Sequence, residues 1–174
     1  MSIGTRRYTL RLDTMRPSIA GGYTVRDATA PDIPTIVRHR LHMFEDMGVV
    51  IDTHAVSAAF AAWLDEHLPD GTYRAWLVEH RGAIVAGGGL VALPWPPGPR
   101  ELSGRLPIIY NIYTEPAHRR QGLARLLMQT IHAWCLEAGY RTVGLAASDE
   151  GRSLYESLGY LESPRPYMFL TLQP

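Results

Sequence analysis

Residues 112–124 read IYTEPAHRRQGLA, and this stretch decides the fold more than any other. An apolar strand ends, a short loop turns the chain, and a helix begins at a basic segment that contains Gly122. The free backbone N–H groups of a helix start, together with the helix dipole, form a site for an anion. Gly122 lets a phosphate approach the backbone closely, and the small Ala124 leaves room beside it. Spacing alone leaves two interpretations open: a phosphate-binding loop, or a strand–helix turn in which Arg119 and Arg120 are merely solvated.

The hydrophobic pattern around this stretch predicts further strands and helices. Residues 106–114 form a continuous apolar and aromatic strand, which we expect to be central in a sheet. The apolar stripe of residues 120–138 predicts the clearest helix, which Gly139 ends. After it the pattern predicts a buried strand, a short helix and a closing strand, at residues 142–147, 152–158 and 167–172.

Two helices and a hairpin are predicted upstream. Pro31 favours the first turn of a helix, Gly48 stops that helix, and Thr53 can cap the next one. Three consecutive glycines, residues 87–89, lie inside the second strand of the hairpin and indicate a bulge or a close approach of another backbone segment. The strands predicted in this half are residues 23–26, 73–79 and 83–93, and a proline-rich loop follows at 94–104.

Together these elements predict an α/β (α+β) fold. The hairpin requires an antiparallel strand pair, and the strand–helix–strand succession from 106 to 147 requires a parallel crossover. We therefore expect a mixed, mostly antiparallel sheet flanked by helices. Residues 1–22 are polar and are expected to be a flexible N-terminal extension, or to include a true start at Met15, and residues 23–174 are expected to form a single domain.

Composition excludes several classes of protein. The sequence has 174 residues and 17 basic side chains, all of them Arg. Without Lys the chain can form neither a Schiff base with a pyridoxal cofactor nor a Walker A phosphate loop. The formal net charge is zero, so no electrostatic argument favours nucleic acid or an anionic membrane as a partner. No apolar run approaches the roughly 20 residues that span a bilayer. With no secretory signal in the sequence, we expect a cytoplasmic protein without a membrane partner.

The cysteine and histidine residues form no metal or redox motif. Cys135 is the single Cys, so neither a disulfide framework nor a Cys-x-x-Cys motif can form within the chain. It falls on the apolar stripe of its helix, where we expect a buried structural thiol. The histidines show no metal-ligand spacing, and we expect no metal site.

A second informative stretch lies at residues 146–160, which read AASDEGRSLYESLGY. Its local pattern is that of a capped helix followed by a glycine stop. Considered alone, Tyr155 would more often be a core aromatic residue than a catalytic one.

In this order and at this separation, the two stretches resemble the GCN5-related N-acetyltransferase (GNAT) superfamily. Arg119, Gly122 and Ala124 match the defining positions of its Q/R-x-x-G-x-G/A acyl-CoA signature. The second stretch matches the Leu-Tyr-Glu-x-x-Gly-Phe/Tyr pattern of the family at residues 154–160. The resemblance covers about residues 23–172, includes the element order, and implies a central sheet of about seven strands.

The resemblance implies a binding site for acetyl-CoA as co-substrate, without a metal. In this family the strand before the signature splays from its parallel neighbour, and the pantetheine arm enters the gap. The residues implied to bind the cofactor are Ile112, Tyr113 and Thr114 along the pantetheine arm, then Arg119, Arg120, Gln121, Gly122, Leu123 and Ala124 around the pyrophosphate. Ser148 stands near the cofactor, where the family often has Asn. Tyr155 occupies the family position of the proton donor to the departing thiolate.

The implied activity is transfer of acetyl from acetyl-CoA to a primary amine by direct attack on the thioester. The acceptor is expected to be a small-molecule or peptide amine, and a homodimer is left open. Many family members carry a Glu base on the central strand, whereas residues 106–114 contain no carboxylate. The alternative bases are His42, Glu45, Asp46, Glu101 and a water chain. The missing strand carboxylate also leaves open a non-catalytic acyl-CoA-binding or regulatory module on the same fold.

Overall fold

The computed structural model describes residues 21–99, 101–163 and 170. The chain divides into two compact units, one of which ends at Ala146 while the other begins at Ala147. The larger unit contains the whole described sheet, and the second contains one helix. The predicted extension at 1–22 lies outside the described residues except for Gly21 and Gly22.

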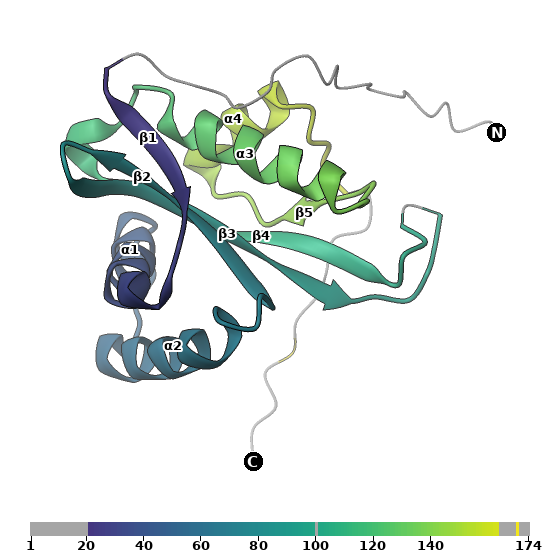
Figure 1. Ribbon diagram of the computed structural model, residues 1–174, viewed down its shortest axis with the longest axis horizontal. Helices are drawn as coiled ribbons and strands as arrows, with labels where there is room; N and C mark the ends of the chain where they lie inside the picture. Colours follow the sequence, from purple (N-terminus) through teal and green to yellow (C-terminus); the bar gives the residue numbers. More distant parts are fainter. Residues whose placement is uncertain (1–20, 100, 164–169, 171–174) are drawn as a thin grey trace. The chain divides into compact units, whose positions relative to one another are not determined.

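Five strands form one sheet in the described part of the chain, in the order β1-β2-β3-β4-β5 (Figure 1). The first four are antiparallel to their neighbours, and β5 runs parallel to β4. The mixed, mostly antiparallel sheet is therefore confirmed, but the expected number of about seven strands is wrong for this sheet. The predicted strand at 167–172 lies almost entirely outside the described residues. The strands are β1 Tyr23–Asp27, β2 Tyr73–His80, β3 Ala83–Pro94, β4 Arg105–Thr114 and β5 Gly144–Leu145.

Helices cover both faces of the sheet in the larger unit. Figure 1 shows α1 and α2 on one side of the strands and α3 on the other. Asp52, rather than the predicted Thr53, caps α2, because its carboxylate accepts a hydrogen bond from the backbone N–H of Ala55 at 2.9 Å. No described helix has the length and apolar character needed to cross a membrane. The helices are the 3-10 turn Ala30–Asp32, α1 Ile33–Asp46, α2 Thr53–His67, the 3-10 turn Pro116–His118, α3 Leu123–Glu137 and, in the second unit, α4 Asp149–Ser157.

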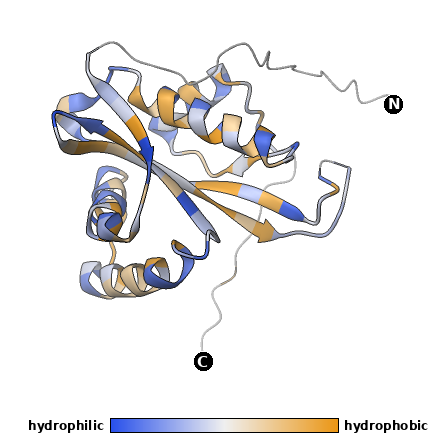
Figure 2. Ribbon diagram, in the orientation of Figure 1, coloured by the Kyte–Doolittle hydropathy of each residue, from blue (hydrophilic) through white to orange (hydrophobic). Residues whose placement is uncertain are grey.

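The core of the larger unit lies between the sheet and helices α1, α2 and α3. Figure 2 shows hydrophobic residues along β4 and along α3. The α3 stripe is buried as its periodicity predicts, and the predicted burial of Cys135 is confirmed. This burial raises the pKa of the Cys135 thiol to about 12. The buried residues of α3 are Leu123, Leu126, Leu127, Met128, Ile131 and Cys135, and those of α1 include Ile33, Ile36 and Val37.

A β-bulge interrupts the pairing of β3 with β4. Gly89 pairs with Tyr110 and Gly87 pairs with Tyr113, so β4 has one more residue than β3 between these pairs. The extra residue lies at Asn111, whose φ of 58° is left-handed. The glycine run permits close approach, since a Cβ on Gly89 would lie 2.5 Å from the ring of Tyr73. The bulge predicted from residues 87–89 is confirmed, with its extra residue in the partner strand.

Strand β5 is shorter than predicted. The pattern predicted a buried strand at 142–147, but only Gly144 and Leu145 pair, and both are half-buried. They pair with Ile108 and Ile109, so the described residues contain no β5 partner for the last part of β4. Strand β4 is also not in the middle of the described sheet, because β3 occupies that position.

Candidate active site

The loop after β4 presents backbone N–H groups at the start of α3. The predicted helix at 120–138 begins only at Leu123, because Arg120 and Gly122 adopt left-handed φ values of 63° and 81°. Gly122 is the N-cap and makes no side-chain cap, and the first helical bond runs from the N–H of Leu126 to the Gly122 carbonyl at 3.0 Å. The preceding N–H groups of the first turn therefore have no partner within the helix. This arrangement, with the positive end of the helix dipole, suits a phosphate group.

Arg119 ties this loop to β4 and α1. Its Nε donates to the Thr114 carbonyl at 3.0 Å, and its Nη2 lies 2.5 Å from Oδ2 of Asp46. Its guanidinium also lies over the Tyr113 ring, 5.7 Å from the centroid. The side chain of Arg119 is thus engaged with protein groups, and Asp46 is paired.

A cluster of rings from two other strands supports the same loop. The Tyr23 hydroxyl donates to Oε1 of Gln121 at 2.5 Å and lies 3.1 Å from Nδ1 of His118. The Tyr23 ring stacks on His80 with centroids 4.4 Å apart. Sequence reasoning missed this support, because these residues share no periodic pattern and come together only through the pairing of β1 with β2.

The predicted cofactor residues fall into two groups. Residues 112–114 and 119–124 lie on one continuous strand, loop and helix start in the larger unit. Ser148 and Tyr155 belong to the second unit. The Ser148 hydroxyl accepts from the N–H of Gly151 at 3.2 Å as the N-cap of α4, which therefore starts before the predicted residue 152. Tyr155 is half-buried, and this burial raises the pKa of its phenol.

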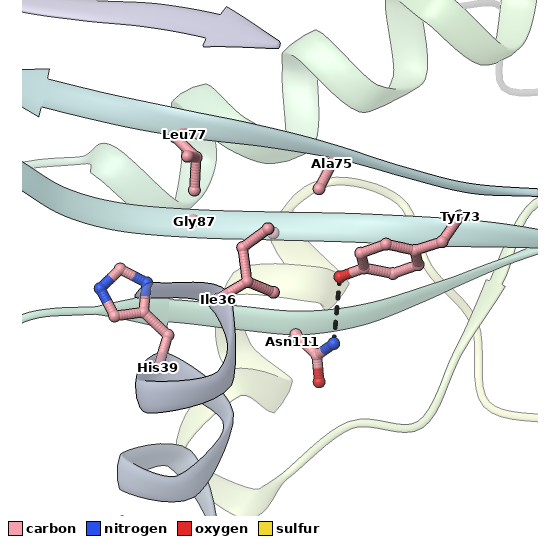
Figure 3. A pocket seen from close by; sticks show the side chains of 8 residues that line it. Ile36, His39, Tyr73, Ala75, Leu77, Gly87 and Asn111 are labelled. Carbon is pink, nitrogen blue, oxygen red and sulfur yellow. Dashed lines mark hydrogen bonds between the residues drawn. The ribbon is translucent and has the colours of Figure 1, made fainter. Parts of the chain in front are cut away.

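Polar contacts hold Asn111 in its left-handed conformation at the bulge. Its Nδ2 donates to the Tyr73 hydroxyl at 3.0 Å, and its Oδ1 accepts from Nη1 of Arg40 at 2.5 Å. The first of these bonds is drawn in Figure 3. Asn is also among the residues that adopt this backbone conformation most readily. The bulge is therefore a rigid feature of β4.

A small cavity lies beside the bulge, and His39 of α1 lines it. Figure 3 shows His39 close to Gly87 in this cavity, which has room of about 10 Å³, enough for about one water molecule. His39 as a residue is 2% exposed, and neither ring nitrogen has a well-aligned hydrogen bond among the described residues. Burial lowers the pKa of His39 to about 4, although nearby Glu115 opposes the shift. His39 is therefore neutral at physiological pH.

A chain of polar contacts joins the end of β4 to α1. The Tyr113 hydroxyl lies 3.4 Å from Nδ1 of His42 and 3.4 Å from Oε2 of Glu115. The other oxygen of Glu115 lies 3.4 Å from Nη2 of Arg38 and 3.3 Å from Nε2 of His39. The chain thus runs from a paired carboxylate, through a phenol, to an imidazole.

His42 also lines an open pocket between α1 and the segment that leads into α2. The pocket has a volume of about 500 Å³, which is in the size range of small-molecule sites. Its lining combines apolar side chains with charged and polar ones. The lining residues are Arg38, Leu41, His42, Glu45, Val49, Val50, Ile51 and Thr53.

Sequence comparison connects these features to a known family. The sequence model of the Acetyltransferase (GNAT) family matches residues 38–160, which is most of the chain. The chain belongs to this family. The resemblance inferred from the two sequence motifs is therefore confirmed, and with it membership in a family of acyltransferases that use acetyl-CoA. No curated protein matches the sequence.

Solved structures of other acetyltransferases share the GNAT fold. A GCN5-related N-acetyltransferase from Ralstonia eutropha JMP134 is 32% identical with a TM-score of 0.78, and the match covers 86% of this chain and 99% of that chain. A predicted acetyltransferase from Clostridium acetobutylicum, solved with acetyl-CoA, is 24% identical with a TM-score of 0.79, covering 86% and 96%. Glucosamine-6-phosphate N-acetyltransferase from Arabidopsis thaliana, 16% identical with a TM-score of 0.66 and coverage of 86% and 99%, shows the fold alone.

The structure separates the candidate bases that the GNAT resemblance left open. Glu101 is 6% exposed, and its carboxylate accepts the backbone N–H groups of Ser103 and Arg141, each at 3.0 Å, and of Thr142 at 3.3 Å. These bonds lower the pKa of Glu101 to about 2, so it anchors a loop and is a poor base. Asp46 is paired with Arg119. His42 and Glu45 remain, and both line the open pocket. The described residues contain no cluster of His, Cys, Asp and Glu that could hold a metal ion.

Proposed function

We propose that this protein is an N-acetyltransferase that moves acetyl from acetyl-CoA to a primary amine by direct attack on the thioester. The observation that carries the proposal is the β4–α3 connection, in which left-handed Arg120 and Gly122 leave the first N–H groups of α3 free of a cap. An uncapped helix start after the short loop that follows β4 supports a pyrophosphate site. The family match supports the same assignment.

The end of β4 supports a place for the pantetheine arm. The pairing of β4 with β5 stops at Ile109, whereas the pairing with β3 resumes after the bulge at Tyr113 and Thr114. The β5-facing edge of residues 112–114 therefore offers backbone groups to the pantetheine amides, in the way that a sheet edge accepts another strand. A backbone N–H at this interruption would stabilise the oxyanion that develops on the thioester carbonyl.

The amine acceptor is assigned to the open pocket beside α1. The pocket includes His42, which contacts the Tyr113 side chain at the end of β4, so it adjoins the strand that would present the thioester. Apolar Leu41, Val49 and Ile51 and the carboxylate of Glu45 suit an amine with a small apolar body. This class includes small-molecule amines and peptide N-termini.

The proposed reaction exchanges the C–S bond of the thioester for a C–N bond. The acceptor ammonium loses a proton to a base, its nitrogen attacks the carbonyl carbon, and the C–S bond breaks. A second proton leaves the nitrogen, while the thiolate takes up one proton. The net products are the N-acetyl amide, CoA thiol and one proton released to solvent. Tyr155 is proposed as the donor to the thiolate because of its position in the sequence pattern.

Release of CoA in the presence of amines tests the proposal. A panel of small-molecule amines, polyamines and short peptides is incubated with protein and acetyl-CoA, and free thiol is measured against time. The blank should stay low, because the chain has no Lys side chain to consume acetyl groups. At least one amine should raise thiol release in proportion to acetylated product. A protein that binds acetyl-CoA but yields no acetylated product from any amine would instead be a non-catalytic acyl-CoA-binding module.

A further inference from the structure

The contacts of Tyr113 define where its proton lies. A neutral phenol carries one O–H, and an ionised carboxylate can only accept hydrogen bonds. The Tyr113 proton therefore points to Oε2 of Glu115, 3.4 Å away. Burial raises the pKa of Tyr113, the negative charges of Glu115 and Asp46 act in the same direction, and Arg119 opposes them, with a net rise that keeps this proton on the phenol.

The direction of the Tyr113 hydroxyl also selects one tautomer of His42. Because the phenol proton is used toward Glu115, the phenol oxygen accepts from Nδ1–H of His42 across 3.4 Å. Nε2 of a neutral His42 then carries the lone pair. Contacts of this length are common in catalytic sites before substrate closes them.

His42 contacts Tyr113 of β4 and shares α1 and the pocket with Arg38 and Glu45, and His39 lies near it on α1. The charged groups near Tyr113 are Glu115, Asp46 and Arg119. His39 is neutral, and Arg38 lies beside one oxygen of Glu115. The α1–α2 segment adds Val49, Val50, Ile51 and Thr53 to the pocket, none of which titrates.

We propose that His42 is the general base that removes the proton from the acceptor ammonium, with Tyr113 and Glu115 as positioning residues. The proposal rests on the acetyltransferase function proposed above. Among the described residues that line the pocket, His42 contacts Tyr113 and Arg38 contacts Glu115 at the end of β4. Of these two, His42 can take up a proton, whereas an arginine stays protonated. Glu45 shares the pocket, but among the described residues its carboxylate makes no hydrogen bond or ion pair with β4.

In the proposed step His42 takes one proton from the acceptor ammonium. The N–H bond of the ammonium breaks, the electron pair stays on nitrogen, and the proton moves to Nε2 of His42. The resulting imidazolium is hydrogen-bonded through Nδ1–H to Tyr113, and the negative charge of Glu115 stabilises it through the phenol. The pocket is open, so the imidazolium then loses its proton to solvent.

Kinetics of His42 variants with the full-length protein test the proposal. His42→Gln keeps a polar side chain but cannot take up a proton, and kcat/KM for the amine should fall by about 10²-fold or more. The thermal shift produced by acetyl-CoA should not change. His42→Ala should regain part of its activity when free imidazole is added, which a purely structural role would not allow. His54→Gln, which alters an exposed histidine at the start of α2, should keep wild-type kinetics.

Tyr113→Phe tests the positioning role. It keeps the ring that faces α1 and removes the hydroxyl between His42 and Glu115. kcat should fall while KM for the amine changes little, because the phenol no longer orients the His42 imidazole through Nδ1. A wild-type enzyme that acetylates amines while His42→Gln retains full kcat/KM would overturn the relay and leave the proposed function intact. A wild-type protein that acetylates no amine overturns both.

Discussion

The oxygens of Glu101 are already occupied by backbone donors, and this decides its role. A carboxylate that accepts several N–H groups is held in its charged form and is unavailable as a base. Glu101 joins the proline-rich loop to the backbone before β5, through the N–H groups of Arg141 and Thr142. The Glu101 carboxylate therefore stabilises the fold.

This role predicts a specific dependence of stability on pH. The pKa of Glu101 is lowered from 4.5 to about 2 in the folded protein. Its contribution is therefore fully present above the unfolded pKa and is lost as the pH falls toward about 2. Glu101→Gln should lower the melting temperature at neutral pH, and its difference from wild type should shrink in acid. Asp32, whose pKa Arg26 also lowers to about 2, should leave part of the acid sensitivity in the variant.

Thermal melts between about pH 7 and pH 2 would check this, with Glu137→Gln as a control on an exposed helical residue. A constant difference between Glu101→Gln and wild type across the range would contradict the assignment.

Tyr155 is proposed as a catalytic residue, and the alternative is a purely structural role as a packed aromatic side chain. Tyr155→Phe removes only the hydroxyl, so packing should survive. If Tyr155 protonates the thiolate, kcat should fall by about 10²–10⁴-fold while acetyl-CoA affinity changes little. An acyl donor with a more acidic thiol should reduce the loss, because a better leaving group needs its proton less.

Steady-state kinetics with matched, folded proteins would decide between these roles, with Tyr140→Phe as the control for loss of a hydroxyl elsewhere. Near-normal kcat in Tyr155→Phe, with chemistry shown to be rate-limiting, would assign protonation of the thiolate to solvent.

At the scale of elements, the start of α3 depends on one glycine. Gly122 combines a left-handed φ of 81° with the N-cap position. Gly122→Asp and Gly122→Asn share the backbone strain of a side chain at positive φ, and Asn tolerates that conformation comparatively well. Only Asp adds a negative charge where the phosphate is expected. Acetyl-CoA affinity should therefore fall much further in Gly122→Asp than in Gly122→Asn.

Isothermal titration of both variants with acetyl-CoA would measure the difference. Equal affinities in the two proteins would contradict the assignment of the phosphate site to this loop.

The β3–β4 bulge depends on a second glycine. A Cβ at Gly89 would lie 2.5 Å from the Tyr73 ring and 2.7 Å from the Arg74 carbonyl, and backbone cannot yield as a flexible side chain can. Gly89→Ala should therefore destabilise the protein by about 1–3 kcal/mol, the usual cost of overpacking a core. Gly98→Ala should be close to neutral, because the nearest atom to its Cβ is the Pro96 carbonyl at 3.9 Å. Urea denaturation would measure both, and equal stabilities would show that the sheet can relax around the added methyl group.

Local sequence patterns predicted the elements well where a single rule governs each of them. Apolar periodicity predicts α1, α2 and α3, and the hairpin turn predicts β2 and β3. The start of α3 was placed three residues too early, because a left-handed Arg120 has no side-chain signature. Asn111 was likewise not recognised, since its conformation depends on Arg40 and Tyr73, which are distant in sequence.

The same reason explains what sequence reasoning missed in the candidate site. Tyr113 was assigned a main-chain role only, whereas strand alternation turns its side chain toward His42 on α1. Glu101 is a candidate base in the sequence because it is a carboxylate in the proline-rich loop. Its anchoring role has no sequence signature, since its three backbone partners come from two separate segments. Contacts of this kind are set by tertiary packing, and the predicted cofactor residues themselves stay a prediction.

At the scale of the whole molecule, acetyl-CoA should stabilise the folded protein. A ligand that binds only the folded state adds about 2.7 kcal/mol to the free energy of unfolding at a hundredfold excess over Kd. In a protein of this size each kcal/mol raises the melting temperature by about 2–4 °C, so a shift of several degrees is expected. CoA should give a comparable shift, because it retains the pyrophosphate and pantetheine groups assigned to residues 112–124.

Gly122→Asp should largely abolish the shift, whereas His42→Gln should retain it, since His42 is assigned to the acceptor pocket. Differential scanning fluorimetry of the three proteins would check this pattern. The absence of any shift in the wild type at millimolar acetyl-CoA would contradict acetyl-CoA binding at this site, since the folded state would then gain nothing from the ligand.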